Sequence, residues 1–282
     1  MINTPRVAAI HDMSGFGRCS LTVVIPVLSA MGVQCCPLPT AFLSTHTGGF
    51  QGFTFLDMTE EMPKVAEHWK SLGLTFAAIY SGFLGSERQI GIVADFIRDF
   101  RTPDTIVVVD PVMGDDGQAY QTYTPSMCGG MARLAELADV ITPNLTEAAF
   151  LLGRDYRELP TDEDGLRRIV EALSLNGKRS VALTGASLSP GKTGAMCFDA
   201  RTGQTEAVQT DFIAHPLHGT GDVFASVLTG ALVKGVSLVE AASQAVDFIH
   251  ACAVRTVAQD LPLREGVDFE PLLGMLAGGE RR

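Results

Sequence analysis

The sequence predicts an α/β protein with three layers (α/β/α) and a mainly parallel central sheet. Short β-branched runs alternate with amphipathic stretches of helical length over most of the 282 residues, and this alternation indicates right-handed βαβ crossovers. The run Thr105–Val109 is apolar throughout, which is typical of a strand covered on both faces. After Thr184 the pattern changes and favours an antiparallel hairpin at one edge of the sheet.

The expected parallel strands are short. They are Val7–Ile10, Thr75–Tyr80, Thr105–Val109, Val140–Thr142 and Ser180–Thr184. A second strand of the first crossover is expected to end in Gln34–Leu38. The hairpin strands are Thr193–Phe198 and Gln204–Asp211, joined by an Asp-Ala-Arg-Thr-Gly turn.

The helix Glu87–Phe100 carries apolar residues at Ile90, Val93, Ile97 and Phe100, spacings of three and four that place them on one helix face. The other expected helices are Leu21–Met31, Met127–Ala138, Asn144–Leu152, Thr161–Leu173, Asp222–Lys234 and Leu238–Val257. Neither a linker nor a repeat interrupts this pattern. We therefore expect a single domain over residues 1–282, with a flexible tail at 276–282.

Composition excludes several classes of protein. Apolar residues make up 46% of the chain and charged residues 19%, so a disordered or disulfide-dense chain is excluded. Lys+Arg 21 against Asp+Glu 32 gives a net charge of −11, which repels nucleic acid and requires a local site for any phosphorylated ligand. Because we find neither a membrane-spanning run nor a signal peptide, we expect a cytoplasmic protein.

The segment His11–Ser20 follows the first strand and opens a helix. Gly15-x-Gly17-x-x-Ser20 is close to a dinucleotide fingerprint, but that interpretation needs an acidic residue at the end of the second strand, and Gln34–Leu38 has none. A nicotinamide oxidoreductase is therefore disfavoured. A tight turn accounts for the glycines equally well, although it leaves Asp12 unexplained.

Acidic residues follow two later strands. Asp110 and Asp115 stand at the tip of the most apolar strand, where carboxylates can neutralise a cation or hold Mg²⁺ beside phosphates, although an ordinary turn would have the same composition. Asn144-x-x-Glu147 is a capping-box pattern that predicts a helix start. A glutamate in that first turn also faces the crevice at the end of the sheet.

The segment His218-Gly219-Thr220-Gly221-Asp222 precedes a long apolar helix. Two glycines allow successive backbone N–H groups to converge, and the helix N-terminus adds partial positive charge, so the segment predicts an anion site. Asp222 would lie close enough to take a proton from an attacking hydroxyl. The alternative role for Asp222 is stabilisation of the helix dipole, worth ~0.3–1 kcal/mol.

The segment Ala186–Thr193 matches a phosphate-binding P-loop except for alanine at the first glycine. A P-loop must lead into a helix, whereas the residues that follow alternate as a strand does. We reject the match and expect Lys192 to be solvated, the alternative being that it reaches a nucleotide phosphate from a loop.

Together, and in this order, these segments resemble the ribokinase-like superfamily of small-molecule kinases, specifically its vitamin B6 (pyridoxal, pyridoxine and pyridoxamine) kinase branch. The resemblance runs from about Val7 to about Val257. It rests on the motifs Asp110-Pro-Val-Met-Gly-Asp115, Thr142-Pro-Asn-x-x-Glu147 and Gly219-Thr-Gly-Asp222. Ser44-Thr-His-Thr47-Gly and Ser81-Gly-Phe83 are similar to segments that lie beside the substrate in that branch.

The resemblance implies a ribokinase-like fold and ATP-dependent phosphorylation of the 5′-hydroxymethyl group of a B6 vitamer, with Mg²⁺ and a monovalent cation such as K⁺. It implies that Asp222 is the base, that Gly219, Thr220 and Gly221 form the anion hole, and that Asp115, Glu147, Asp110 and Thr142 serve the cations. The implied contacts to ATP and its phosphates are Asn144, Thr184, Gly185 and His218, with Phe212–Leu217 and a late helix over the adenine. The implied substrate contacts are Asp12, Ser14, Thr47 and Phe83.

Other functions stay open. His218-Gly-Thr-Gly is also similar to the hydroxymethylpyrimidine kinases of thiamine synthesis, which usually carry cysteine at the position of Asp222, so this residue favours the B6 branch. A catalytically silent vitamer sensor on the same fold is the alternative outside enzymes. Aromatic residues such as Phe16, Phe50 and Phe83 could sandwich the substrate ring, or lie in the core. The apolar segment Phe50–Leu56 suggests a covered surface, as in a homodimer, and the buried core of a monomer is the alternative explanation.

Overall fold

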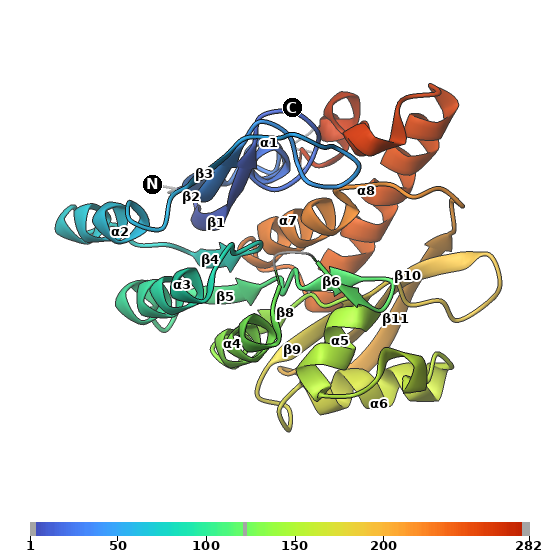
Figure 1. The fold of residues 1–282 in the computed structure, drawn as a ribbon. Helices are drawn as coiled ribbons and strands as arrows, with labels where there is room; N and C mark the ends of the chain where they lie inside the picture. Colours follow the sequence, from blue (N-terminus) through green and yellow to red (C-terminus); the bar gives the residue numbers. More distant parts are fainter. Residues whose placement is uncertain (1–3, 121–122, 278–282) are drawn as a thin grey trace, which may run out of the picture.

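The computed structural model describes residues 4–120 and 123–277 and contains a nine-stranded sheet in the order β11-β10-β9-β8-β5-β4-β1-β2-β3 (Figure 1). Six neighbouring strands are parallel: β1 (Arg6–Ser14), β2 (Gln34–Leu43), β4 (Ala78–Ser81), β5 (Ile106–Val109), β8 (Val140–Ile141) and β9 (Ser180–Thr184). Antiparallel strands flank them: β3 (Phe55–Asp57) at one edge, β10 (Lys192–Asp199) and β11 (Gln204–Asp211) at the other.

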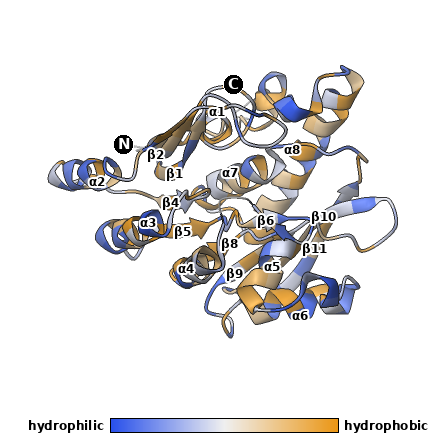
Figure 2. Ribbon diagram, viewed as in Figure 1, coloured by the Kyte–Doolittle hydropathy of each residue, from blue (hydrophilic) through white to orange (hydrophobic). Residues whose placement is uncertain are grey.

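Each face of the sheet is covered by its own helices and its own core. Helices α2 (Met62–Ser71), α3 (Glu87–Phe100), α4 (Pro125–Ala135), α5 (Leu145–Leu152) and α6 (Glu163–Leu173) pack on one face, and α1 (Leu21–Ala30), α7 (Thr220–Leu232) and α8 (Leu238–Ala258) pack on the other. Because successive side chains of a strand point to opposite faces, Ala8 and Ile10 of β1 enter the first core, whereas Val7 and Ala9 enter the second. Figure 2 shows the hydrophobic residues concentrated on the strands between these layers.

This three-layer arrangement confirms the predicted fold class, and β10 pairs antiparallel with β11 as the predicted hairpin requires. Strand β10 begins at Lys192, which confirms that the P-loop-like segment leads into a strand. Lys192 itself pairs with Asp211 across the hairpin at 2.7 Å. Several elements were not predicted, among them the short edge strand β3 and the helix α2, which buries only Met62.

Smaller elements complete the chain. Strands β6 (Gly114–Asp115) and β7 (Gln118–Ala119) form a separate two-stranded hairpin, and 3₁₀ turns occupy Tyr156–Glu158, Leu263–Glu265 and Glu270–Met275. Of the tail expected at 276–282, Leu276 packs against the core, and residues 278–282 lie outside the described part. Among the described helices, none is long and apolar enough to cross a membrane.

Candidate active site

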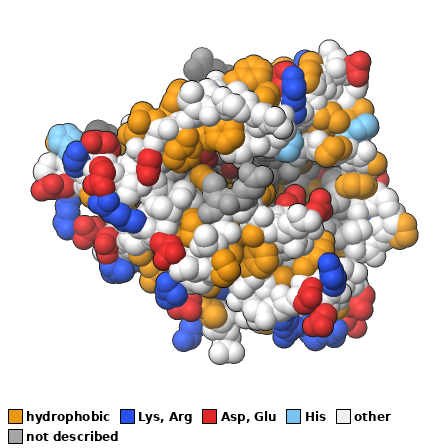
Figure 3. All heavy atoms as spheres, viewed as in Figure 1, with side chains coloured by type: hydrophobic (Ala, Val, Ile, Leu, Met, Phe, Trp, Pro, Cys, Tyr) orange, Lys and Arg blue, Asp and Glu red, His pale blue; other side chains and the backbone are white. Residues whose placement is uncertain are grey.

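A cavity of about 430 Å³ opens where the carboxyl ends of β5, β8 and β9 meet the N-terminus of α7. On the face drawn in Figure 3, acidic and histidine side chains lie around a central hollow. Twelve of the site residues predicted from the sequence line this cavity: Asp110, Asp115, Thr142, Asn144, Glu147, Thr184, Gly185, His218, Gly219, Thr220, Gly221 and Asp222.

The N-terminus of α7 is built to receive an anion. Gly219 is the N-cap, with φ 77° and ψ 1°, and no side chain caps the helix, so the first-turn N–H groups have no intrahelical partner. A Cβ at position 219 would lie 2.0 Å from the carbonyl oxygen of Arg18, whereas a Cβ at Gly221 would meet nothing within 4 Å. Glycine is therefore required at 219, both by its positive φ and by the close approach of the turn.

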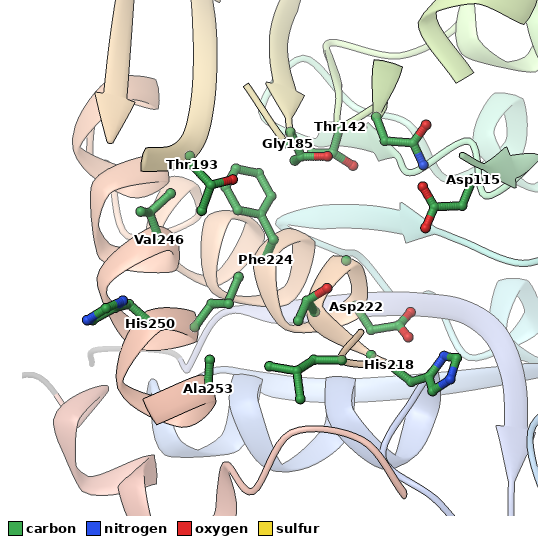
Figure 4. Close-up of a pocket in the computed structure, with 18 of the residues that line it drawn as sticks. Asp115, Thr142, Gly185, Thr193, His218, Asp222, Phe224, Val246, His250 and Ala253 are labelled. Atoms are coloured by element: carbon green, nitrogen blue, oxygen red, sulfur yellow. The ribbon is translucent and has the colours of Figure 1, made fainter. Parts of the chain in front are cut away.

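Asp222 lies in the first turn of α7, with 17% of its side chain exposed. Burial raises its pKa to about 7, the backbone amide of Ser20 opposes that shift, and the charge of Asp12 adds to it. A carboxylate with a pKa near neutrality is matched to accepting and releasing a proton at physiological pH. In Figure 4, Asp222, His218 and Asp115 lie at the same end of the cavity.

Three more carboxyl groups line this end. Burial raises the pKa of Glu147 to about 7, and it raises the pKa values of Asp115 and Asp110, the latter well above its ordinary value. The hydroxyl of Thr142 donates to Asp110 at 3.0 Å. Burial disfavours the ionised form of each carboxyl group, and a cation bound among them would stabilise that form.

Glu147 and Asn144 form the predicted capping box at the start of α5. The backbone amide of Asn144 donates to Glu147 Oε2 at 2.9 Å, and the backbone amide of Met113 donates to Glu147 Oε1 at 3.0 Å. Asn144 Nδ2 donates to the carbonyl oxygen of Gly114 at 2.8 Å. The same two side chains therefore start a helix and hold the Asp110–Asp115 turn against it.

The donor set suits a hard cation shared with phosphate. Mg²⁺ is usually bound through one or two carboxylates together with water and substrate phosphates. Within residues 4–120 and 123–277, no group of three or more His, Cys, Asp or Glu side chains is arranged to hold a metal by itself. Asp115 is the more exposed neighbour of the buried Glu147, and this pair of carboxyl groups fits the shared mode of binding.

The far end of the cavity is apolar. Helix α8 contributes Val246, Ile249, His250 and Ala253, and residues 212–217 supply Phe212, Ile213 and Leu217. Figure 4 shows Val246, His250 and Ala253 on α8, at the opposite end of the drawn lining from Asp115 and His218. Gly185 lies between the two ends in Figure 4, so the cavity has room for an elongated ligand with a flat group against α8 and an anionic group at α7.

Four predicted substrate contacts lie outside this lining. Asp12 is buried near the end of β1, where it accepts hydrogen bonds from Ser14 (3.1 Å) and from Ser20 in the following turn (2.5 Å). Thr47 is exposed, and Phe83 is half-buried on the α2–α6 side of the sheet. Asp12 and Ser14 thus hold the turn together, whatever else they contact.

A strap from the C-terminal part of the chain fixes this turn. The guanidinium of Arg18 pairs with Asp268 (3.0 Å) and Glu270 (2.8 Å), and the Arg18 amide donates to the carbonyl oxygen of Glu265 at 2.9 Å. His46 Nε2 lies 2.7 Å from the carbonyl oxygen of Arg264. The ring centroids of His46 and His218 are 5.3 Å apart. Residues 263–270 therefore hold two loops beside the anion site.

Sequence reasoning missed several residues at this site. Val112 lines the cavity with φ 40°, an uncommon conformation for a β-branched residue, and Tyr120 lines it from the end of the β6–β7 hairpin. His11 is fully buried with its Nδ1 at 3.9 Å from Asp222 Oδ1. For His11 the available signal was a polar residue that continues the apolar run Val7–Ile10.

Comparison with known proteins agrees with this geometry. The profile of the phosphomethylpyrimidine kinase family matches residues 25–266. The hydroxymethylpyrimidine/phosphomethylpyrimidine kinase of Rhizobium meliloti is 28% identical over 241 residues, covering 83% of this chain and 85% of that protein. The pyridoxine kinase of Bacillus subtilis is 31% identical over 196 residues, 69% of each chain.

Solved structures give the same result. A Bacteroides thetaiotaomicron protein named for phosphomethylpyrimidine kinase, in a crystal form with pyridoxal, is 43% identical with a TM-score of 0.93 over 99% of this chain and 98% of that one. Pyridoxal kinase from Lactobacillus plantarum is 30% identical with a TM-score of 0.89 over 97% of each chain. The chain belongs to the phosphomethylpyrimidine kinase family and is a ribokinase-like kinase.

Proposed function

We propose that this kinase transfers the γ-phosphoryl group of ATP to the 5′-hydroxymethyl group of a vitamin B6 vitamer: pyridoxal, pyridoxine or pyridoxamine. The observation that carries the proposal is the position of Asp222, on the first turn of an uncapped helix whose free amides face the same cavity. The 43% identity to a structure determined with pyridoxal supports the vitamer, as does aspartate where hydroxymethylpyrimidine kinases usually have cysteine.

Catalysis of such a transfer depends mainly on positioning and charge stabilisation, because the transition state is loose and its negative charge is spread over the transferring oxygens. The amides of Gly219, Thr220 and Gly221 stabilise that charge. The Asp222 carboxylate takes the proton of the attacking hydroxyl. The apolar end of the cavity, lined by α8 and residues 212–217, takes the adenine.

Mg²⁺, when bound, supplies charge neutralisation between the phosphates. Asp115 and Glu147 would hold it with the nucleotide, and Asn144, Thr184, Gly185 and His218 would contact the phosphates. Asp110 and Thr142 would help to place a monovalent cation such as K⁺. Asp12, Ser14, Thr47 and Phe83 remain the proposed substrate-side residues.

Hydroxymethylpyrimidine kinase is the second candidate, because the family profile and the Rhizobium meliloti relative carry that name. The decisive experiment measures ATP-dependent phosphorylation of pyridoxal, pyridoxine, pyridoxamine and hydroxymethylpyrimidine side by side, with and without Mg²⁺. We expect the highest kcat/KM with a B6 vitamer. Preference for the pyrimidine would overturn the proposal, and binding of a vitamer without turnover would favour a sensor.

The proposal includes a homodimer. Apolar side chains are exposed around the β2–β3 edge, among them Phe42, Phe55 (47% exposed) and Leu56 (60% exposed). An exposed apolar patch on an edge strand is a common association surface. Sedimentation velocity of the wild type and of Leu56→Glu tests this, and a wild-type monomer would contradict it.

A further inference from the structure

His11 is a buried polar residue whose partners within the described chain are missing. Its side chain is fully buried, and neither ring nitrogen has a hydrogen-bond partner among the described residues. Buried polar groups are nearly always hydrogen-bonded, so an exception calls for a functional explanation. Burial also lowers the pKa of His11 to about 3, so the imidazole is neutral and has one N–H to donate.

The position of His11 in β1 places it beneath the catalytic turn of α7. Val7 and Ala9 precede it on the same face of the strand and pack in one core with Val223 of α7. An apolar residue would continue that pattern, but β1 has histidine there instead. Its Nδ1 lies 3.9 Å from Asp222 Oδ1, about 1 Å beyond hydrogen-bond length.

The neighbouring strand leaves room for this ring. A Cβ at Gly82 would lie 1.9 Å from His11 Cε1 and 2.2 Å from Nδ1. Tyr80 contacts the ring edge-on, with centroids 4.5 Å apart. The imidazole thus packs against β4 and the glycine that follows it, with Nδ1 toward Asp222 of α7.

We propose that His11 is a positioning residue that donates the Nδ1–H hydrogen bond to the Asp222 carboxylate during phosphoryl transfer and so directs that carboxylate to the acceptor hydroxyl. The inference rests on the proposed function, because it gives Asp222 the role of base. The Ser20 amide faces Asp222 from the turn after β1, so the serine amide and His11 together fix the carboxylate. His11 stays neutral, and the proton of the hydroxyl goes to Asp222.

The test compares three substitutions of His11. His11→Leu removes the donor, His11→Asn keeps an amide nitrogen near the position of Nδ1, and His11→Gln carries its amide nitrogen near the position of Nε2. We expect kcat of His11→Leu to fall roughly 10–100-fold, the range that misplacement of a reacting group by about 1 Å produces. KM for ATP and for the alcohol should stay within about threefold. His11→Asn should recover most of the loss, and His11→Gln should not.

Thr229→Val is the matched control, because it removes another buried polar group without a described partner, here a hydroxyl on α7, the helix that carries Asp222. It should leave kcat unchanged. A His11→Leu variant with wild-type kcat, or an asparagine variant no better than the glutamine variant, would overturn the proposal. The comparison of asparagine with glutamine decides even if the leucine variant does not fold.

All variants are assayed with whichever alcohol the wild type phosphorylates. Failure of the wild type on every B6 vitamer refutes the proposed substrate. The response of kcat to the His11 substitutions separately decides the positioning role.

Discussion

The hydroxyl of Ser20 donates a 2.5 Å hydrogen bond to the carboxylate of Asp12, and the backbone amide of the same serine faces Asp222. Ser20 has φ 51°, an uncommon conformation for a residue with a side chain. The bond to Asp12 stabilises that conformation. Asp12 therefore holds in place the Ser20 amide that faces Asp222.

Asp222→Asn removes the proposed proton acceptor and keeps the size of the side chain. We expect kcat to fall ~10²–10⁴-fold, the usual contribution of general acid–base catalysis, with nucleotide affinity retained. Steady-state kinetics and calorimetric titration with ATP measure the two effects. Turnover within tenfold of the wild type would show that Asp222 is not the base.

The pH dependence of kcat/KM should reflect the raised pKa of Asp222. Only the ionised carboxylate accepts a proton, and burial raises its pKa to about 7. Activity is therefore expected to rise with pH through about 7 and to be largely lost below pH 6. An acidic limb near pH 4, the ordinary range of aspartate, would contradict this assignment.

Gly219→Ala should disrupt the anion site, because the added Cβ would lie 2.0 Å from the Arg18 carbonyl oxygen at a residue with φ 77°. We expect a lower melting temperature and a large loss of turnover. Gly221→Ala is the control for stability, since its Cβ meets nothing within 4 Å and alanine favours helix. Thermal unfolding of both variants measures the difference, and equal destabilisation would refute the steric argument.

Asn144→Ala removes the N-cap of α5 together with the bond to the Gly114 carbonyl oxygen. The loss of unfolding free energy should be ~1–2 kcal/mol, as for other N-caps. Asn144→Ser retains a capping hydroxyl and should lose less. Urea denaturation of both variants measures this, and equal losses would mean that the cap contributes little.

Asp268→Ala leaves Arg18 and Arg255 without their shared acceptor, which lies 3.0 Å and 2.6 Å from them. Hydrogen bonds to charged groups contribute ~1.5–3 kcal/mol each, so we expect a loss of about 2–3 kcal/mol and reduced turnover. Asp211→Ala breaks an exposed pair with Lys192 and should leave stability unchanged within error. Urea denaturation of both variants measures the two losses of stability, and similar midpoints would contradict the structural role of the strap.

The sequence was most informative where local chemistry and the fold agree. The spacing of Asn144 and Glu147 predicted a capping box, and the structure contains it. Strand β1 was predicted to end at Ile10, because the polar residues His11 and Asp12 end the apolar pattern. In the structure the strand continues to Ser14. The burial of His11 and Asp12 depends on α7 and on Ser20, which a local pattern cannot reveal.

The sequence was least informative at the β2–β3 edge. Strand β2 contains Pro37 and Pro39, which remove backbone donors, and β3 is three exposed residues long. Helix α2 buries only Met62. Such elements are held by pairing with neighbours rather than by their own periodicity, so β3 and α2 were not recognised from the sequence and only the first part of β2 was expected.

The pairing of Arg18 with Asp268 joins positions 250 residues apart. Contacts of such long sequence separation form late in folding, because closing the intervening loop is entropically unfavourable. A chain cleaved before residue 263 could retain the central strands yet lack the strap, residues 263–270, that binds Arg18. The carbonyl oxygen of Arg18 lies against Gly219. Catalytic competence in this protein would thus depend on intact polypeptide far from the reacting groups.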